Sequence, residues 1–138
     1  MPSYKYLIVG GGMTADAAVR GIRQVDANRA IGLISAEPSP PYNRPPLSKG
    51  LWQSAKIESI WRKTESQGVE FHLGRKAQTL DSRNKRITDD QGTVYTFDKL
   101  LLATGGSPSR LPFGDDQIIY FRNLQDYQRL RGLAEQVE

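Results

Sequence analysis

The feature that most constrains this chain is a run of three glycines, Gly10–Gly12, which directly follows six mostly apolar residues. Those six residues, Tyr4–Val9, include β-branched and aromatic side chains, so we expect a buried strand. Beyond the glycines, apolar residues recur at helical spacing over Met13–Val25. Ala30–Ser35 then predicts a second buried strand. Strand, glycine turn, helix and strand together predict a parallel, right-handed βαβ unit.

Within the turn, Gly10, Gly12 and Ala15 form the pattern Gly-x-Gly-x-x-Ala. The first glycine permits a tight turn, the second lets a pyrophosphate approach the backbone, and the small third residue packs helix on strand. Glu37 follows the second strand, where a carboxylate can accept hydrogen bonds from ribose hydroxyls and disfavours a 2′-phosphate. The pattern therefore predicts FAD or NAD, with the phosphates at the helix N-terminus. The residues expected to bind the cofactor here are Gly10, Gly12, Met13, Thr14, Ala15 and Glu37.

The amino-acid composition excludes several kinds of metal and redox site. The chain has no cysteine and one histidine, which excludes disulfides, thiolate metal sites and a histidine-rich metal centre. Redox chemistry would then rely on a bound organic cofactor. The net charge of +4 comes from basic residues that stand singly or in pairs among acids, so we do not expect nucleic-acid binding. A basic surface for an acidic protein partner stays open. No apolar run reaches the roughly 18 residues of a membrane span, and no secretory signal is visible, so we expect a cytoplasmic location.

The remaining sequence changes character twice. Glu37–Gly50 holds five of the eight prolines and predicts an extended loop, followed by a short helix over Glu58–Gly68. Short strand-like runs then fill residues 69–104 and predict a β-meander that feeds a last buried strand. We expect its strands at Val69–Leu73, Ala77–Leu80, Arg86–Thr88, Val94–Phe97 and Leu100–Ala103. A further strand is expected at Ile118–Phe121, and Asn123 is expected to cap a helix over Leu124–Val137.

Two segments carry a resemblance to a known family. Residues 41–49 read PYNRPPLSK and residues 99–108 read KLLLATGGSP. Together with the glycine turn, they resemble the ferredoxin reductase and apoptosis-inducing-factor-like branch of the FAD-dependent pyridine nucleotide-disulfide oxidoreductases. The resemblance implies that Arg44 lies at the pyrophosphate or flavin and that Lys49 lies at the N5 side of the flavin. Prolines would hold both cations in place, and a cation there stabilises the negative charge of the reduced flavin.

Further contacts with FAD are implied by the same resemblance. Ala77 would touch the adenine, and the second fingerprint would place Ala103, Thr104 and Gly105 against the cofactor. The family often has an arginine directly after the proline of this fingerprint. Here that position is Ser109, so the role passes to Arg110.

The implied fold is α/β, an FAD-type Rossmann-like doubly wound parallel sheet with an inserted antiparallel β-meander. Residues 1–138 would be the N-terminal portion of an FAD-binding domain, without the family's NADH-binding and C-terminal domains. The implied full-length enzyme passes electrons from NADH or NADPH through FAD to a ferredoxin-like protein or a quinone. Alone, the chain is expected to be inactive, with its exposed sheet edge covered in a homo-oligomer.

Two other functions stay open. One is a flavin-free NAD-binding dehydrogenase domain, against which the PYNRPPLSK loop speaks. The other is a non-catalytic FAD- or NAD-binding or signalling module. Outside the motifs, we read His72, Trp52 and Trp61 as structural residues and Asp16 as a complement to the helix dipole.

Overall fold

The computed structural model describes residues 1–137 and divides them into two compact units. The first unit consists of Met1–Tyr42 and Trp61–Gly105. The second consists of Asn43–Ile60 and the chain from Gly106 onward. The proline-rich loop therefore leaves the first unit after Tyr42 and returns to it at Trp61.

A six-stranded sheet organises the first unit, with the order β3-β2-β1-β6-β5-β4. Four neighbouring strands are parallel: β1 (Ser3–Val9), β2 (Ile31–Ser35), β3 (Val69–Leu73) and β6 (Val94–Leu102). The strands β4 (Ala77–Asp81) and β5 (Arg86–Asp89) complete the sheet with antiparallel pairing. This confirms the predicted α/β class, with a parallel sheet that carries an antiparallel insertion.

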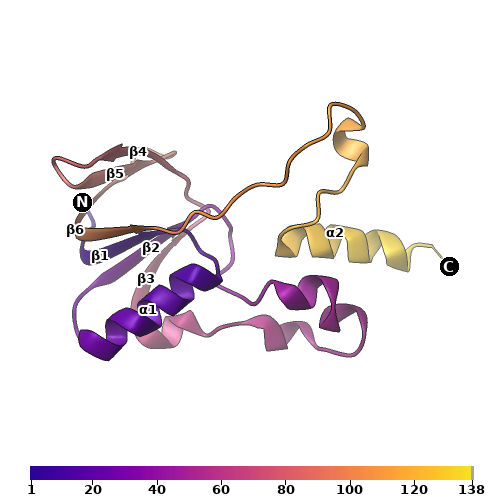
Figure 1. Ribbon diagram of the computed structural model, residues 1–138, viewed down its shortest axis with the longest axis horizontal. Helices are drawn as coiled ribbons and strands as arrows, with labels where there is room; N and C mark the ends of the chain where they lie inside the picture. Colours follow the sequence, from indigo (N-terminus) through magenta and orange to yellow (C-terminus); the bar gives the residue numbers. More distant parts are fainter. Residues whose placement is uncertain (138) are drawn as a thin grey trace. The chain divides into compact units, whose positions relative to one another are not determined.

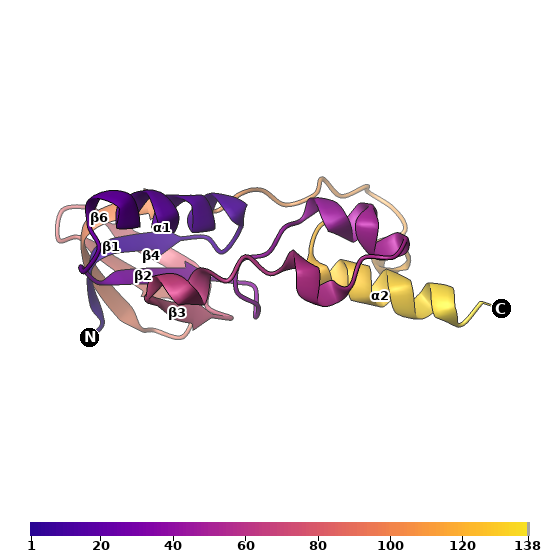
Figure 2. The same cartoon turned by 90° about the horizontal axis from the view of Figure 1, so that it is seen from below.

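The two faces of this sheet are covered differently (Figure 1). Helix α1 (Met13–Val25) packs Ala15 and Val19 against Ile8 and Leu33 of the parallel strands. Figure 2 shows the same helix lying alongside β1. On the opposite face, Ile87 of the β4–β5 hairpin packs with Leu7 and further apolar residues. A single helix therefore covers one face of the described sheet, and the hairpin covers the other.

An aromatic cluster joins β1, β3 and β6 on the hairpin side. The Tyr4 hydroxyl lies 2.6 Å from Nε2 of His72, and the His72 and Tyr95 rings meet edge to face with centroids 4.8 Å apart. Tyr95 in turn donates its hydroxyl to the buried Asp89 carboxylate at 2.8 Å. Burial and the nearby Arg75 lower the pKa of His72, although the Glu70 and Asp89 carboxylates oppose the shift. His72 is therefore a structural residue that joins β3 to its neighbours.

The second unit contains short 3-10 helices and one α-helix. Helix α2 (Leu124–Glu135) begins with a capping box, in which Asn123 accepts from the Asp126 backbone N–H and the Asp126 carboxylate accepts from the Asn123 N–H. This confirms the predicted cap. The 3-10 helices of this unit are η1 (Pro45–Ser48), η2 (Gly50–Trp52), η3 (Ile57–Ile60) and η5 (Asp115–Gln117).

Two predictions about strands were wrong in detail. Val69–Leu73 is not part of the meander but pairs in parallel with β2. The two strands expected at Val94–Phe97 and Leu100–Ala103 are one strand, β6, because its pairing with β1 continues through Lys99.

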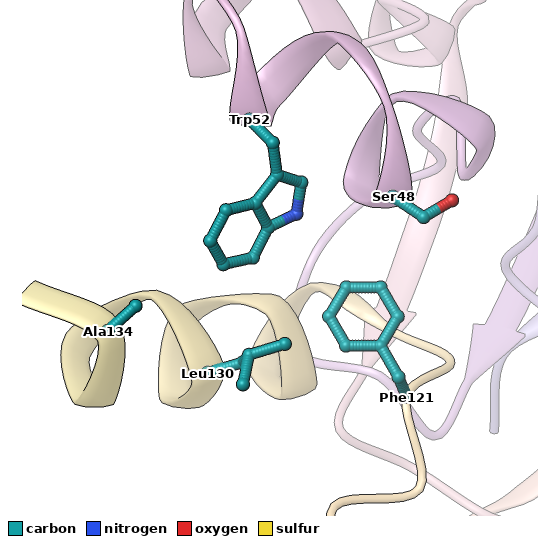
Figure 3. Close-up of a pocket in the computed structure, with 5 residues that line it drawn as sticks. All are labelled: Ser48, Trp52, Phe121, Leu130 and Ala134. Carbon is teal, nitrogen blue, oxygen red and sulfur yellow. The ribbon is translucent and has the colours of Figure 1, made fainter.

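Two further predictions placed regular structure where there is little. Ile118–Phe121 forms no strand; Phe121 instead lies beside Leu130 of α2 (Figure 3). The helix expected over Glu58–Gly68 is two 3-10 helices, η3 and η4 (Thr64–Gln67). They are separate because Trp61 pairs with Tyr42 and Lys63 adopts a left-handed conformation with φ 56°.

Asp16 anchors the segment that returns from the second unit. Its side chain is fully buried and accepts hydrogen bonds from Arg20 Nε at 3.0 Å, Arg62 Nε at 2.6 Å and Thr64 Oγ1 at 2.6 Å. Burial alone would raise the pKa of Asp16, but the hydrogen bonds from Arg20, Thr64 and Arg62 outweigh it and hold this pKa below its usual value. The carboxylate thus ties α1 to residues far along the chain, a role beyond the predicted complement to the helix dipole.

We predict that Asp16→Asn lowers the free energy of unfolding by about 2–3 kcal/mol, because an amide cannot satisfy two guanidinium groups and a buried hydroxyl together. A carboxyl whose pKa is depressed in the folded state stabilises at neutral pH and loses that effect as the pH falls through its folded pKa. The difference between wild type and variant should therefore shrink below about pH 4. Urea unfolding at several pH values measures it.

Asp98→Asn is the matched control. Asp98 forms an exposed ion pair with Lys5 at 3.1 Å, and such pairs contribute at most about 1 kcal/mol. Equal losses in the two variants would contradict the role given to Asp16.

Candidate functional site

The carboxyl ends of the four parallel strands bring several predicted residues of the first unit to one edge. Gly10 directly follows β1, Glu37 lies two residues beyond β2, and Ala103 directly follows β6. The chain runs from β1 to β2 on one side of β1, whereas β6 lies on its other side. Reversals of this kind leave a crevice at the carboxyl edge, which is where ligands bind in open α/β sheets.

Gly10 is required by the fold itself. Its φ of 128° lies in a region that side chains rarely adopt, and a Cβ there would overlap the carbonyl oxygen of Ala103. The Ala103 N–H also donates to the Val9 carbonyl at 2.7 Å. The glycine turn and the start of the Ala103–Gly105 segment are therefore held together by backbone contacts.

Gly12 differs from Gly10 in having no such requirement. Its φ of −93° suits any residue, and a Cβ there would meet no other atom of the described chain within 4 Å. Gly12 is also the N-cap of α1, and no side chain among residues 1–137 caps the helix at this end. Backbone N–H groups at the start of a helix without a side-chain cap can bind an anion by donating hydrogen bonds to it. The space over Gly12 therefore fits the close approach of a pyrophosphate.

Glu37 is held in place by neighbours in the first unit. Its carboxylate accepts the Tyr42 hydroxyl at 2.7 Å, its N–H donates to Ser35 Oγ at 3.2 Å, and its carbonyl accepts from Gly74 at 3.1 Å. Ser35 and Tyr42 were missed as contributors to the site. Tyr42 stands in the PYNRPPLSK segment itself, but the family resemblance assigned roles only to the two cations of that segment.

The other predicted site residues of the first unit differ in their exposure to solvent. Met13 and Thr14 are exposed on the first turn of α1, whereas Ala15 is fully buried against the sheet, as the third position of the fingerprint requires. Thr104 and Gly105 are exposed beyond β6. Ala77 begins β4 and packs against the apolar cluster on the hairpin side.

Three predicted cations belong to the second unit. Arg44 and Lys49 flank the single 3-10 turn η1, with Pro45 as its first residue. Arg44 donates to the carbonyl of Arg122 at 3.3 Å, and the exposed Arg110 lies over the Tyr120 ring at 4.7 Å. The prolines thus form a rigid spacer between Arg44 and Lys49. Contact of these cations with a flavin stays a prediction.

A pocket of about 430 Å³ also lies in the second unit (Figure 3). Four of its five lining side chains are apolar or aromatic, with Trp52 facing Leu130 across the opening. The lining residues are Ser48, Trp52, Phe121, Leu130 and Ala134. Arg44, Lys49 and Arg110 are not among them.

Two kinds of feature are absent from the part of the chain that the structure describes. Among residues 1–137, no group of three or more His, Cys, Asp or Glu side chains is arranged to hold a metal ion. Nor does that part of the chain contain a helix with the length and hydrophobicity of a membrane span.

The chain is similar to several known proteins. It is 32% identical to apoptosis-inducing factor 1 of Dictyostelium discoideum, over 92% of this chain and 28% of that protein. It is 33% identical to the ferredoxin–NAD(+) reductase component of the p-cumate 2,3-dioxygenase system of Pseudomonas putida, over 95% of this chain and 34% of that protein. A chain of the covalent putidaredoxin reductase–putidaredoxin complex matches with a TM-score of 0.84 and 26% identity, over 96% of this chain and 34% of that chain.

This chain thus spans 28% and 34% of the length of these two relatives. Residues 4–136 match the family described as pyridine nucleotide-disulphide oxidoreductase, which confirms the resemblance seen in the motifs. With a glycine turn and an acid at the carboxyl edge of a parallel sheet, the chain belongs to the pyridine nucleotide-disulphide oxidoreductase family.

Proposed function

We propose that this chain is the FAD-binding portion of an NAD(P)H-dependent oxidoreductase that delivers electrons to a ferredoxin-like protein or a quinone. The observation that carries the proposal is Gly12, a glycine that the fold does not need, at the uncapped start of α1. The relatives named as ferredoxin–NAD(+) reductase and putidaredoxin reductase support the nicotinamide reductant and the ferredoxin-like acceptor.

Each predicted site residue of the first unit has a defined role in this proposal. Gly10 and Gly12 leave room for the pyrophosphate, and the amides of Met13 and Thr14 face it at the positive end of the helix dipole. Glu37 accepts hydrogen bonds from the ribose hydroxyls of the adenosine. Ala77 contacts the adenine, and Ala103, Thr104 and Gly105 border the cofactor beside the turn.

The cations of the second unit would act on the flavin. When bound, FAD would supply the redox chemistry: it can take up a hydride and then release the two electrons one at a time. Lys49 is proposed to stabilise the negative charge that reduction creates, and Arg44 and Arg110 to hold the phosphates or the ring. Prolines at the first two positions of η1 restrict the backbone between Arg44 and Lys49.

Reduction by NADH or NADPH is proposed for a protein of the relatives' length. The 138 residues contain one strand–glycine–helix fingerprint, which we assign to FAD. The chain by itself is therefore expected to bind FAD without oxidising NADH. A second function, an FAD-binding signalling module, is favoured by the likeness to apoptosis-inducing factor, and NADH oxidation by a protein of the relatives' length would speak against it.

We predict that Gly12→Val abolishes FAD binding without unfolding the chain, because valine suits the backbone at this position but fills the space for the pyrophosphate. Titration of the FAD-free chain with FAD, followed by flavin fluorescence, measures the effect. Gly21→Val is the matched control, since Gly21 is an exposed residue of α1 with equally open space around it. Normal FAD content in the Gly12 variant would refute the site.

We also predict that Lys49→Gln lowers the reduction potential of bound FAD by roughly 20–40 mV, equivalent to about 1–2 kcal/mol for a two-electron couple. The cause is the loss of a cation beside the reduced ring. Spectroscopic titration against a redox dye measures the potential. Lys56→Gln, another exposed lysine of the second unit, should leave it unchanged. A potential equal to that of wild type in the Lys49 variant would mean that Lys49 is a solvated surface charge.

A further inference from the structure

Hydrogen bonds within the first unit hold Glu37 through its side chain, its N–H and its carbonyl. Tyr42 donates to one carboxylate oxygen, Ser35 accepts from the N–H, and Gly74 donates to the carbonyl. Ser35 is 3% exposed and lies against Gly11, where even a Cβ would overlap its hydroxyl. Ser35 therefore contacts both the glycine turn and the backbone of Glu37, two residues beyond the end of β2.

Tyr42 is itself held rigidly. It is 2% exposed, its ring meets that of Trp61 edge to face with centroids 6.0 Å apart, and its backbone forms an antiparallel bridge with Trp61. The neighbouring Arg62 N–H donates to the Pro41 carbonyl at 3.3 Å. The Tyr42 hydroxyl consequently has little freedom to leave the Glu37 carboxylate.

The same segment is tied to the helix that begins at the glycine turn. Arg62 and Thr64 both donate to Asp16, which is buried in α1. A continuous path therefore runs from α1 through Asp16, Arg62, Trp61 and Tyr42 to Glu37, entirely within the first unit. Its members hold the helix start and the acid in one arrangement.

We propose that Tyr42 and Ser35 are positioning residues that preset the Glu37 carboxylate for the ribose hydroxyls of an adenine nucleotide. The inference rests on the proposed function, since it takes Glu37 as the ribose acceptor. A glutamate side chain that is ordered only on binding lowers affinity, because its rotamer freedom is then lost in the complex. A carboxylate can accept about four hydrogen bonds, so the bond from Tyr42 is compatible with bonds from a ribose.

The decisive variant is Tyr42→Phe, which removes the hydroxyl and keeps the ring on Trp61. The probes are ADP and 2′,3′-dideoxy-ADP, titrated calorimetrically into the FAD-free chain. We expect the Kd for ADP to rise about three- to tenfold and that for the dideoxy nucleotide to stay within about twofold, because it has no ribose hydroxyls to recognise. A purely structural role would change both affinities alike.

Two further variants complete the test. Tyr6→Phe is the matched control, because Tyr6 also donates its hydroxyl to a carboxylate, that of Asp26 at 2.9 Å, but beyond the opposite end of α1. It should leave both affinities unchanged. Ser35→Ala should lower the affinity for ADP by about two- to threefold and leave the affinity for the dideoxy nucleotide unchanged. It tests the proposal independently if Tyr42→Phe does not fold, as thermal unfolding will show.

The outcomes separate this inference from the proposed function. Loss of ADP affinity alone supports the positioning role. An equal loss for both nucleotides, or no loss for either, in Tyr42→Phe and Ser35→Ala overturns it. A wild-type chain that binds neither nucleotide, or does not distinguish them, refutes Glu37 as the ribose acceptor and with it the inference. That failure appears without any substitution.

Discussion

The backbone contact between Gly10 and Ala103 is the constraint on which the rest of the first unit depends. It occurs where two parallel strands, β1 and β6, end side by side, and it leaves no room for any side chain at Gly10. Because β2 lies on the other side of β1, the connections diverge at this point. The turn over Gly10–Gly12 therefore lies at the carboxyl edge of the sheet, and α1 starts directly after it.

Around this turn, polar side chains position helix α1 and Glu37. Asp16 is buried and pairs with two partly exposed arginines and with Thr64. The hydrogen bonds from these partners outweigh the effect of burial and hold the pKa of Asp16 below its usual value. Tyr42 and Ser35 perform the corresponding task for Glu37 through uncharged donors and acceptors. Helix and acid are thereby set relative to each other by the protein alone, which reduces the ordering that a nucleotide would have to impose.

The βαβ unit could be predicted from the sequence because its signals are local. Helical periodicity gave α1 its bounds of Met13–Val25 as the structure has them, and Asn123 marked the start of α2. The neighbours of a strand are not local information. Val69–Leu73 has the same composition whether it pairs with β2 or with a meander, and only long-range contacts decide between them.

The site shows the same division. Gly10, Gly12 and Glu37 stand at intervals that a known ligand geometry explains, so sequence reasoning could propose them as site residues. Asp16 lies 46 and 48 residues from Arg62 and Thr64, and no pattern in the sequence reveals that the three meet. Tyr42 was visible within a motif, yet its bond to Glu37 depends on how the proline-rich loop leaves the sheet and returns at Trp61.

The most direct test of the central claim, that the turn and Glu37 form a preset adenine-nucleotide site, is an NMR titration of the isotopically labelled chain with ADP. We expect the largest changes in amide chemical shift at Gly12, Met13, Thr14 and Glu37. Saturation with no change at these amides, or with changes centred on the pocket beside Trp52, would contradict it.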